Sequence, residues 1–164
     1  MTTDAATAPM AQGVRHTGLV VRSLARSLEF YRDLLGLREL SRAVETGPFI
    51  EALVGLPEAE LEWVKLRAED GTLVELLQYR SHLRPGDGAG EVCATGRVHL
   101  AFTVRDVDAL HRALAERGLV CKHPPLLSAD GRCKVMYCSD PDNVDLEFVE
   151  QVLPPQGPAT AGGV

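Results

Sequence analysis

The chain has 164 residues, of which 45% are hydrophobic and 24% are charged, as in an ordinary globular protein. Its formal net charge is −6 and it has no dense cluster of Lys and Arg, so neither nucleic acid nor an anionic membrane surface is an expected partner. No apolar run reaches the ~20 residues of a membrane span, and no secretory signal opens the chain. We therefore predict a cytoplasmic protein.

Three polar segments divide the chain. Residues 1–12 are rich in Ala and Thr and residues 153–164 are rich in Pro, Gly and Ala, which predicts flexible tails. Residues 81–95 contain the run GDGAG, which lacks the lysine and the following helix of a phosphate-binding loop. This segment is therefore a predicted linker between two modules, residues 13–80 and 96–152.

Each module is predicted to begin with a strand that leads into a helix. HTGLVVRSLARSLEFYRDLLGL starts at His16, and HLAFTVRDVDALHRALAERGLV starts at His99. In each stretch a β-prone run reaches a residue that favours the N-cap position, Ser23 or Asp106. Apolar residues then recur at helical spacing until a glycine, which is typical of a left-handed C-terminal cap. These are Leu24, Leu28, Tyr31, Leu35 and then Gly36 in the first helix, and Val107, Leu110, Leu114 and then Gly118 in the second.

The modules also end alike. GTLVELLQY, which ends at Tyr79, resembles NVDLEFVEQ, which ends at Gln151, and each is an apolar strand opened by a turn residue. Between helix and last strand each module has room for two more strands. These are predicted near Arg38–Val44, Leu61–Arg67, Leu119–Lys122 and Cys133–Ser139. The predicted fold class is therefore α+β, with two βαβββ modules related by pseudo-twofold symmetry.

Two histidines and two glutamates occupy equivalent places in the modules. His16 and His99 begin the first strands, and Glu75 and Glu147 lie inside the last strands. A carboxylate within an apolar strand is costly unless it is paired or bound to a metal. Mixed imidazole and carboxylate ligation suits divalent Ni, Co, Zn, Mn or Fe. If the modules pack symmetrically, their strands form a curved mixed sheet around a metal site that these four side chains make.

Taken in order, four stretches of the chain resemble the vicinal-oxygen-chelate superfamily. This superfamily includes glyoxalase I, methylmalonyl-CoA epimerase, extradiol dioxygenases, and bleomycin- and fosfomycin-resistance proteins. The resemblance runs from His16 to about Val152, through HTGLVVRSLARSLEFYRDLLGL, GTLVELLQY, GRVHLAFTVRDVDAL and SDPDNVDLEFVE. One departure is Asn143, where the family usually has glycine, but asparagine tolerates a left-handed backbone and should preserve the turn. The resemblance also implies a homodimer.

The ligand set of His16, Glu75, His99 and Glu147 resembles bacterial-type glyoxalase I most closely. It implies a metal-dependent lyase or isomerase that chelates two oxygens of a small substrate and transfers a proton through a metal-stabilised enediolate. Glu147 is the first candidate for the catalytic base, and Glu75 is the symmetric alternative. The stretch GPFIEALVGLPEAELEWV is expected to cover the pocket.

Two other functions stay open. A non-haem Fe(II) dioxygenase of the extradiol type would use His16, His99 and Glu147 as its metal triad. Its signature also wants a histidine where this chain has Ser128, Ala129 and Asp130, which ranks this alternative lower. The other alternative, an antibiotic- or metabolite-binding resistance protein, has no need of all four ligands. Three residues nearby carry weaker predictions: His123 as a second contact of the site, Tyr137 as core, and Asp145 as a pocket or a solvated strand-end residue.

Overall fold

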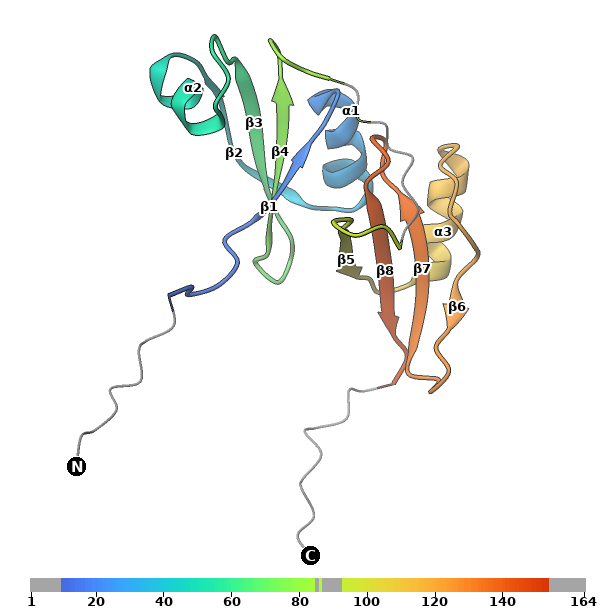
Figure 1. Cartoon of the computed structure of the whole chain (residues 1–164). Helices are drawn as coiled ribbons and strands as arrows, with labels where there is room; N and C mark the ends of the chain where they lie inside the picture. Colours follow the sequence, from blue (N-terminus) through green and yellow to red (C-terminus); the bar gives the residue numbers. More distant parts are fainter. Residues whose placement is uncertain (1–9, 85, 87–92, 154–164) are drawn as a thin grey trace, which may run out of the picture. The chain divides into compact units, whose positions relative to one another are not determined.

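The structure is a computed structural model that describes residues 10–84, 86 and 93–153 (Figure 1). Most of both predicted tails, and part of the predicted linker, lie outside these residues. The chain divides into two compact units. The first unit contains Leu35–Leu83 and the chain before Ala25, and the second contains Ala25–Leu34 and the chain after Leu83. Among the described residues, no helix combines the length and apolar character needed to span a bilayer.

The first unit is built on a four-stranded mixed sheet with the strand order β1-β4-β3-β2. Its strands are β1 (Thr17–Val20), β2 (Arg38–Glu45), β3 (Leu61–Arg67) and β4 (Leu73–Tyr79). β1 runs parallel to β4, and the other neighbours are antiparallel. Val74 and Leu76 are fully buried on one face of β4. Because side chains alternate along a strand, Glu75 points to the opposite face.

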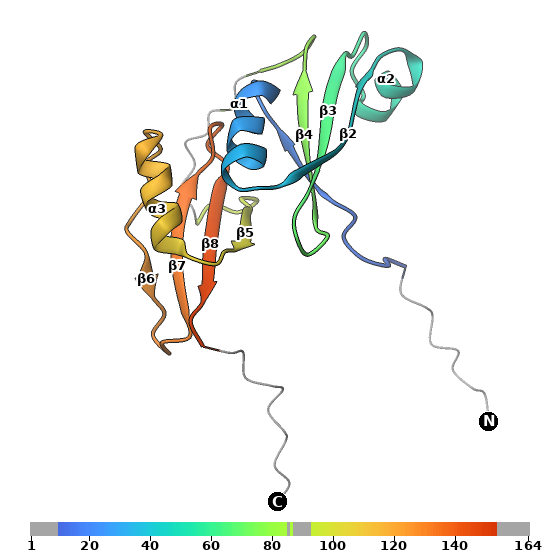
Figure 2. The same cartoon turned by 180° about the vertical axis from the view of Figure 1, so that it is seen from behind.

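The second unit repeats this arrangement, with the strand order β5-β8-β7-β6. Its strands are β5 (His99–Thr103), β6 (Leu126–Leu127), β7 (Cys133–Ser139) and β8 (Asp145–Gln151). Helix α3 (Val107–Glu116) packs against β7 and β8, on the face of the sheet seen in Figure 2. Leu146 and Phe148 are fully buried on one face of β8, and Glu147 alternates with them. The predicted pair of βαβββ modules is confirmed.

Three of the predicted capping residues, Asp106, Gly118 and Gly36, are confirmed. Asp106 caps α3 by accepting a hydrogen bond from the amide of Ala109, at 2.7 Å. Gly118 follows this helix with a left-handed φ of 71°. The first helix begins as α1 (Leu24–Leu28) and continues as the π-helix η1 (Glu29–Leu34), before Gly36 takes a φ of 81°.

The segment Ala25–Leu34 belongs to the second unit, although the sequence places it within the first module. Tyr31 is fully buried, and its hydroxyl donates a hydrogen bond of 2.8 Å to Asp140. The ring of Tyr31 also lies 6.5 Å from that of Phe102 on β5. Asp140 opens the turn in which Asn143 has a φ of 66°, so the left-handed turn expected at this asparagine is present.

One local prediction was wrong. No strand forms at Leu119–Lys122, where Cys121 makes only an isolated bridge to Cys138. Regular pairing resumes at β6, after Pro124 and Pro125, because prolines lack the amide hydrogen that a ladder needs. The stretch expected to cover the pocket contains a helix, α2 (Pro48–Val54), which starts with a proline at a position that tolerates it, and its covering role stays a prediction.

Candidate functional site

The first histidine–glutamate pair lies on the sheet of the first unit. Glu75 stands opposite Gly18 of β1 and Lys65 of β3. His16 precedes β1, and its Nε2 lies 3.0 Å from Oε2 of Glu75. Lys65 Nζ lies 3.2 Å from the other carboxylate oxygen and 4.4 Å from the centre of the Trp63 ring. Both oxygens of an almost buried carboxylate are therefore engaged by nitrogen.

The second pair lies at the equivalent place in the second unit. Glu147 stands opposite Ala101 of β5 and Tyr137 of β7, which is the same register as around Glu75. His99 Nε2 lies 3.2 Å from Oε2 of Glu147. Tyr137 faces the same side of the sheet as Glu147, and its ring centre is 5.6 Å from that of His99. Desolvation, together with the charge of Glu147, raises the pKa of Tyr137, so the phenol stays protonated.

The geometry of each pair suits a divalent metal ion. Two ligand atoms that each lie about 2.1 Å from one ion, at right angles, are about 3.0 Å apart. The nitrogen–oxygen distances in the two pairs are 3.0 and 3.2 Å. Nδ1 of His16 is buried and has no hydrogen-bond partner among the described residues, but Nε2 is the ring nitrogen that faces Glu75, so an ion shared by this pair would leave Nδ1 as it is.

Each pair by itself supplies two ligands. Within residues 10–84, 86 and 93–153, no three His, Cys, Asp or Glu side chains form a group that could hold a metal ion. The centre of His16, Glu75, His99 and Glu147 draws one pair from each unit and stays a prediction.

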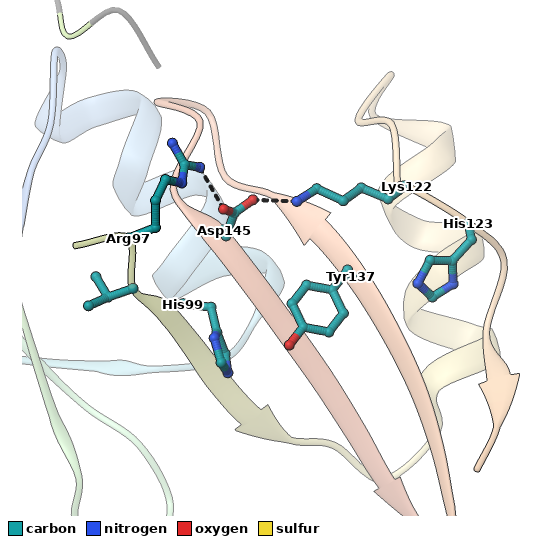
Figure 3. A pocket seen from close by; sticks show the side chains of 7 residues that line it. Arg97, His99, Lys122, His123, Tyr137 and Asp145 are labelled. Carbon is teal, nitrogen blue, oxygen red and sulfur yellow. Dashed lines mark hydrogen bonds and ion pairs between the residues drawn. The ribbon is translucent and has the colours of Figure 1, made fainter. Parts of the chain in front are cut away.

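Beside His99, the second unit has a cavity of about 330 Å³ (Figure 3). Its lining residues are Arg97, Val98, His99, Lys122, His123, Tyr137 and Asp145. His123 thus lines the same cavity as His99, which is consistent with the prediction that His123 makes a second contact with the site. Tyr137 lines the cavity instead of lying in the core, because it projects from β7 on the face opposite to the buried Met136 and Cys138.

Asp145 is the most buried charged group of this cavity, with 7% of its side chain exposed. Arg97 Nη2 lies 2.6 Å from one carboxylate oxygen, and Lys122 Nζ lies 2.6 Å from the other. Hydrogen bonds from Lys122 and then Arg97 hold the pKa of Asp145 below its usual range. Sequence periodicity gave no signal for Arg97 or Lys122, because both lie outside the regular strands.

This lowered pKa predicts acid sensitivity. A carboxyl group with a depressed folded-state pKa adds stability that is complete above its ordinary value of 3.8 and is lost as the pH falls through the folded value. We therefore expect the urea concentration at which half of the wild type is unfolded to decrease as the pH is lowered below 3.8. In Asp145→Asn this decrease should be smaller. Parallel profiles for the two proteins would contradict this assignment.

Comparisons with known proteins agree on the family. The profile of the Glyoxalase/Bleomycin resistance protein/Dioxygenase superfamily matches residues 13–148. The uncharacterized protein YwbC of Bacillus subtilis (strain 168) is 27% identical over 146 residues, which are 87% of this chain and all of that protein. Two solved structures share the fold. A glyoxalase family protein from Bacillus cereus has a TM-score of 0.82 at 20% identity, over 91% of this chain and 100% of that one.

The second structure is the fosfomycin resistance protein FosX from Listeria monocytogenes, solved with Mn(II) and a sulfate ion. Its TM-score is 0.56 at 16% identity, and the match covers 88% of this chain and 96% of that one. The profile match, which spans most of the chain, agrees with the repeated βαβββ architecture. The chain therefore belongs to the glyoxalase/bleomycin resistance protein/dioxygenase superfamily.

Proposed function

We propose that this protein is a metal-dependent isomerase or lyase of the glyoxalase and epimerase type. In this proposal His16, Glu75, His99 and Glu147 hold one divalent ion, and the substrate is a small molecule with two neighbouring oxygens. The observation that carries the proposal is the repetition of the His–Glu pair, at 3.0 and 3.2 Å, at equivalent register positions. FosX, which shares the fold, was solved with Mn(II). A bound divalent ion supplies Lewis-acid polarisation of a substrate carbonyl.

Glu147 is the better candidate for the base that removes a carbon-bound proton. Its side chain is 22% exposed and its partner His99 is 49% exposed, whereas the side chain of Glu75 is only 12% exposed. Glu75 is also held by the ammonium of Lys65 in addition to His16. A substrate can therefore reach Glu147 more readily. Tyr137, whose pKa is raised by desolvation and by the charge of Glu147, stands beside this carboxylate as a neutral phenol.

A non-haem Fe(II) oxygenase is the second candidate. The observation that favours it is the cavity itself, in which His123 and Tyr137 accompany His99. An oxygenase of the extradiol type needs a histidine close to its iron ligands, and His123 supplies one from a segment that the extradiol signature does not cover.

Metal content separates these functions. Protein purified without chelators is expected to contain about one equivalent of Ni, Co, Zn or Mn by elemental analysis, and His99→Ala is expected to lose most of it because a centre that lacks one of four ligands binds far more weakly. His82→Ala is the matched control, because His82 contacts Ser81 and belongs to neither pair.

Each result has a clear meaning. Iron in place of the other metals would favour the oxygenase. Equal metal loss in His82→Ala and His99→Ala would contradict the assigned ligands. Absence of metal after reconstitution with each ion would contradict both enzyme proposals and favour a binding protein of the resistance type.

A further inference from the structure

The cavity beside His99 is lined by two cationic side chains and only one carboxylate. Arg97 and Lys122 both bind Asp145, and a single counter-charge is enough to neutralise one carboxylate. The nearby Glu147 is paired with His99 and is not among the lining residues. In a chain with a formal net charge of −6, two cations on one small cavity are a local exception.

Both cations keep unused hydrogen-bond donors. An arginine has five N–H groups and a lysine has three, and here each directs one interaction to Asp145. Neither side chain has another hydrogen-bond or ion-pair partner among the described residues. Their side chains are 25% and 36% exposed, so the remaining donors are open to a ligand from solvent.

The spacing of the two cations fits one oxyanion. Figure 3 shows Arg97 and Lys122 reaching the Asp145 carboxylate from opposite sides. The two oxygens of a carboxylate are about 2.2 Å apart. Two nitrogens that each hydrogen-bond to a different one of these oxygens are therefore at most roughly 7–8 Å apart. Asp145 fills the space between these two nitrogens, so a second oxyanion in the cavity would be met by the remaining N–H groups of Arg97 and Lys122, beside the Asp145 carboxylate. His99 and His123 border the same cavity.

We propose that this cavity binds an oxyanion, either a carboxylate or a phosphate-type group, through the N–H groups of Arg97 and Lys122 that Asp145 leaves free. Asp145 acts as the positioning residue that holds the two cations at the required spacing. The assignment of this anion to the substrate rests on the proposed function, since it places the anionic group beside the proposed ligand His99. The substrate class is then a small acid whose chelating oxygens lie close to its charged group.

The test is an anion titration of the full-length, chelator-treated protein at constant ionic strength. Inorganic phosphate and acetate are the two probes, and amide chemical shifts in NMR spectra report binding near Val98 and Lys122. Saturable binding of either probe is expected, and the probe that binds tells which group the site takes. Arg97→Gln and Lys122→Gln are each expected to weaken it about ten-fold, because each removes a charge-assisted hydrogen bond.

Lys134→Gln is the matched control. It removes the same charge from the same unit, but Lys134 pairs with Asp108 and does not line the cavity. Lys134→Gln is expected to weaken anion binding by less than about two-fold, because a charge that acts only through solvent is screened by salt. Absence of saturable binding of both probes, or an equal loss in Lys134→Gln, would overturn the proposal.

Two further measurements keep the result unambiguous. If Arg97→Gln or Lys122→Gln fails to fold, the same change is made in an Asp145→Asn background, where no buried carboxylate is left without its counter-ion. Metal content is measured on the same samples of Arg97→Gln and Lys122→Gln before chelation and is expected to be unchanged. Anion binding in a protein that never holds metal would uphold this site while removing the proposed metal-dependent function.

Discussion

Glu147→Gln is expected to slow proton transfer by about 10³-fold, because an amide cannot accept the proton that a general base removes. The measurement is deuterium incorporation from solvent into a panel of small 2-hydroxyketones and 2-oxoaldehydes, with and without a carboxylate or phosphate group, followed by NMR. The compound that the wild type labels fastest is used for the comparison. Both proteins are assayed at saturating metal, so that a weaker ligand at this position does not mimic the loss of a base.

Glu116→Gln is the control for this experiment. Glu116 is exposed at the end of α3 in the same unit, so the same chemical change there leaves proton transfer intact. Full exchange activity in Glu147→Gln would assign the base to another residue, with Glu75 as the next to test. A wild type that labels none of the compounds would contradict the proton-transfer function itself.

Phe148→Ala is expected to destabilise the second unit by about 3–5 kcal/mol, the usual cost of removing a buried aromatic ring. Phe148 is fully buried on β8, and its ring stacks on that of Phe102 at 5.9 Å. The cavity left by the ring would lie directly behind Glu147, which alternates with Phe148 along the strand. Urea denaturation followed by circular dichroism measures the change in free energy of unfolding.

Phe49→Ala makes the same chemical change on the surface. The side chain of Phe49, on α2, is 72% exposed, so its removal should alter stability by no more than about 0.5 kcal/mol. Comparable losses in the two variants would mean that Phe49 is covered in solution, by another copy or another surface. A loss below about 1 kcal/mol in Phe148→Ala would contradict the packing described for β8.

The repeat was the part of the fold that the sequence predicted best. Strands β3 and β7 have the predicted bounds, and both capping glycines, Gly36 and Gly118, take left-handed conformations. These features depend on local chemistry, namely alternation of apolar residues and the freedom of glycine, so they can be read without knowledge of tertiary structure. The two His–Glu pairs followed from the same alignment.

The residues that surround Glu75 and Asp145 could not be predicted in this way, because they are brought there by contacts between segments. Lys65 reaches Glu75 only because β3 pairs with β4 in one particular register, and Arg97 and Lys122 meet only at Asp145. The periodicity of apolar residues within one segment does not specify which residues of two different segments come into contact. The repeat did contain a usable signal for Lys65, because alignment of the two modules places it at the position of Tyr137.

This exchange of lysine for tyrosine has a consequence for substrate orientation. A protein with two identical halves would bind a substrate in two equivalent orientations, and either glutamate could then act as the base. Here Glu75 stands opposite the ammonium group of Lys65 and Glu147 stands opposite the phenol of Tyr137, so the two orientations differ in energy. If the two pairs act on one substrate as proposed, one orientation predominates and the division of labour between the two glutamates is fixed.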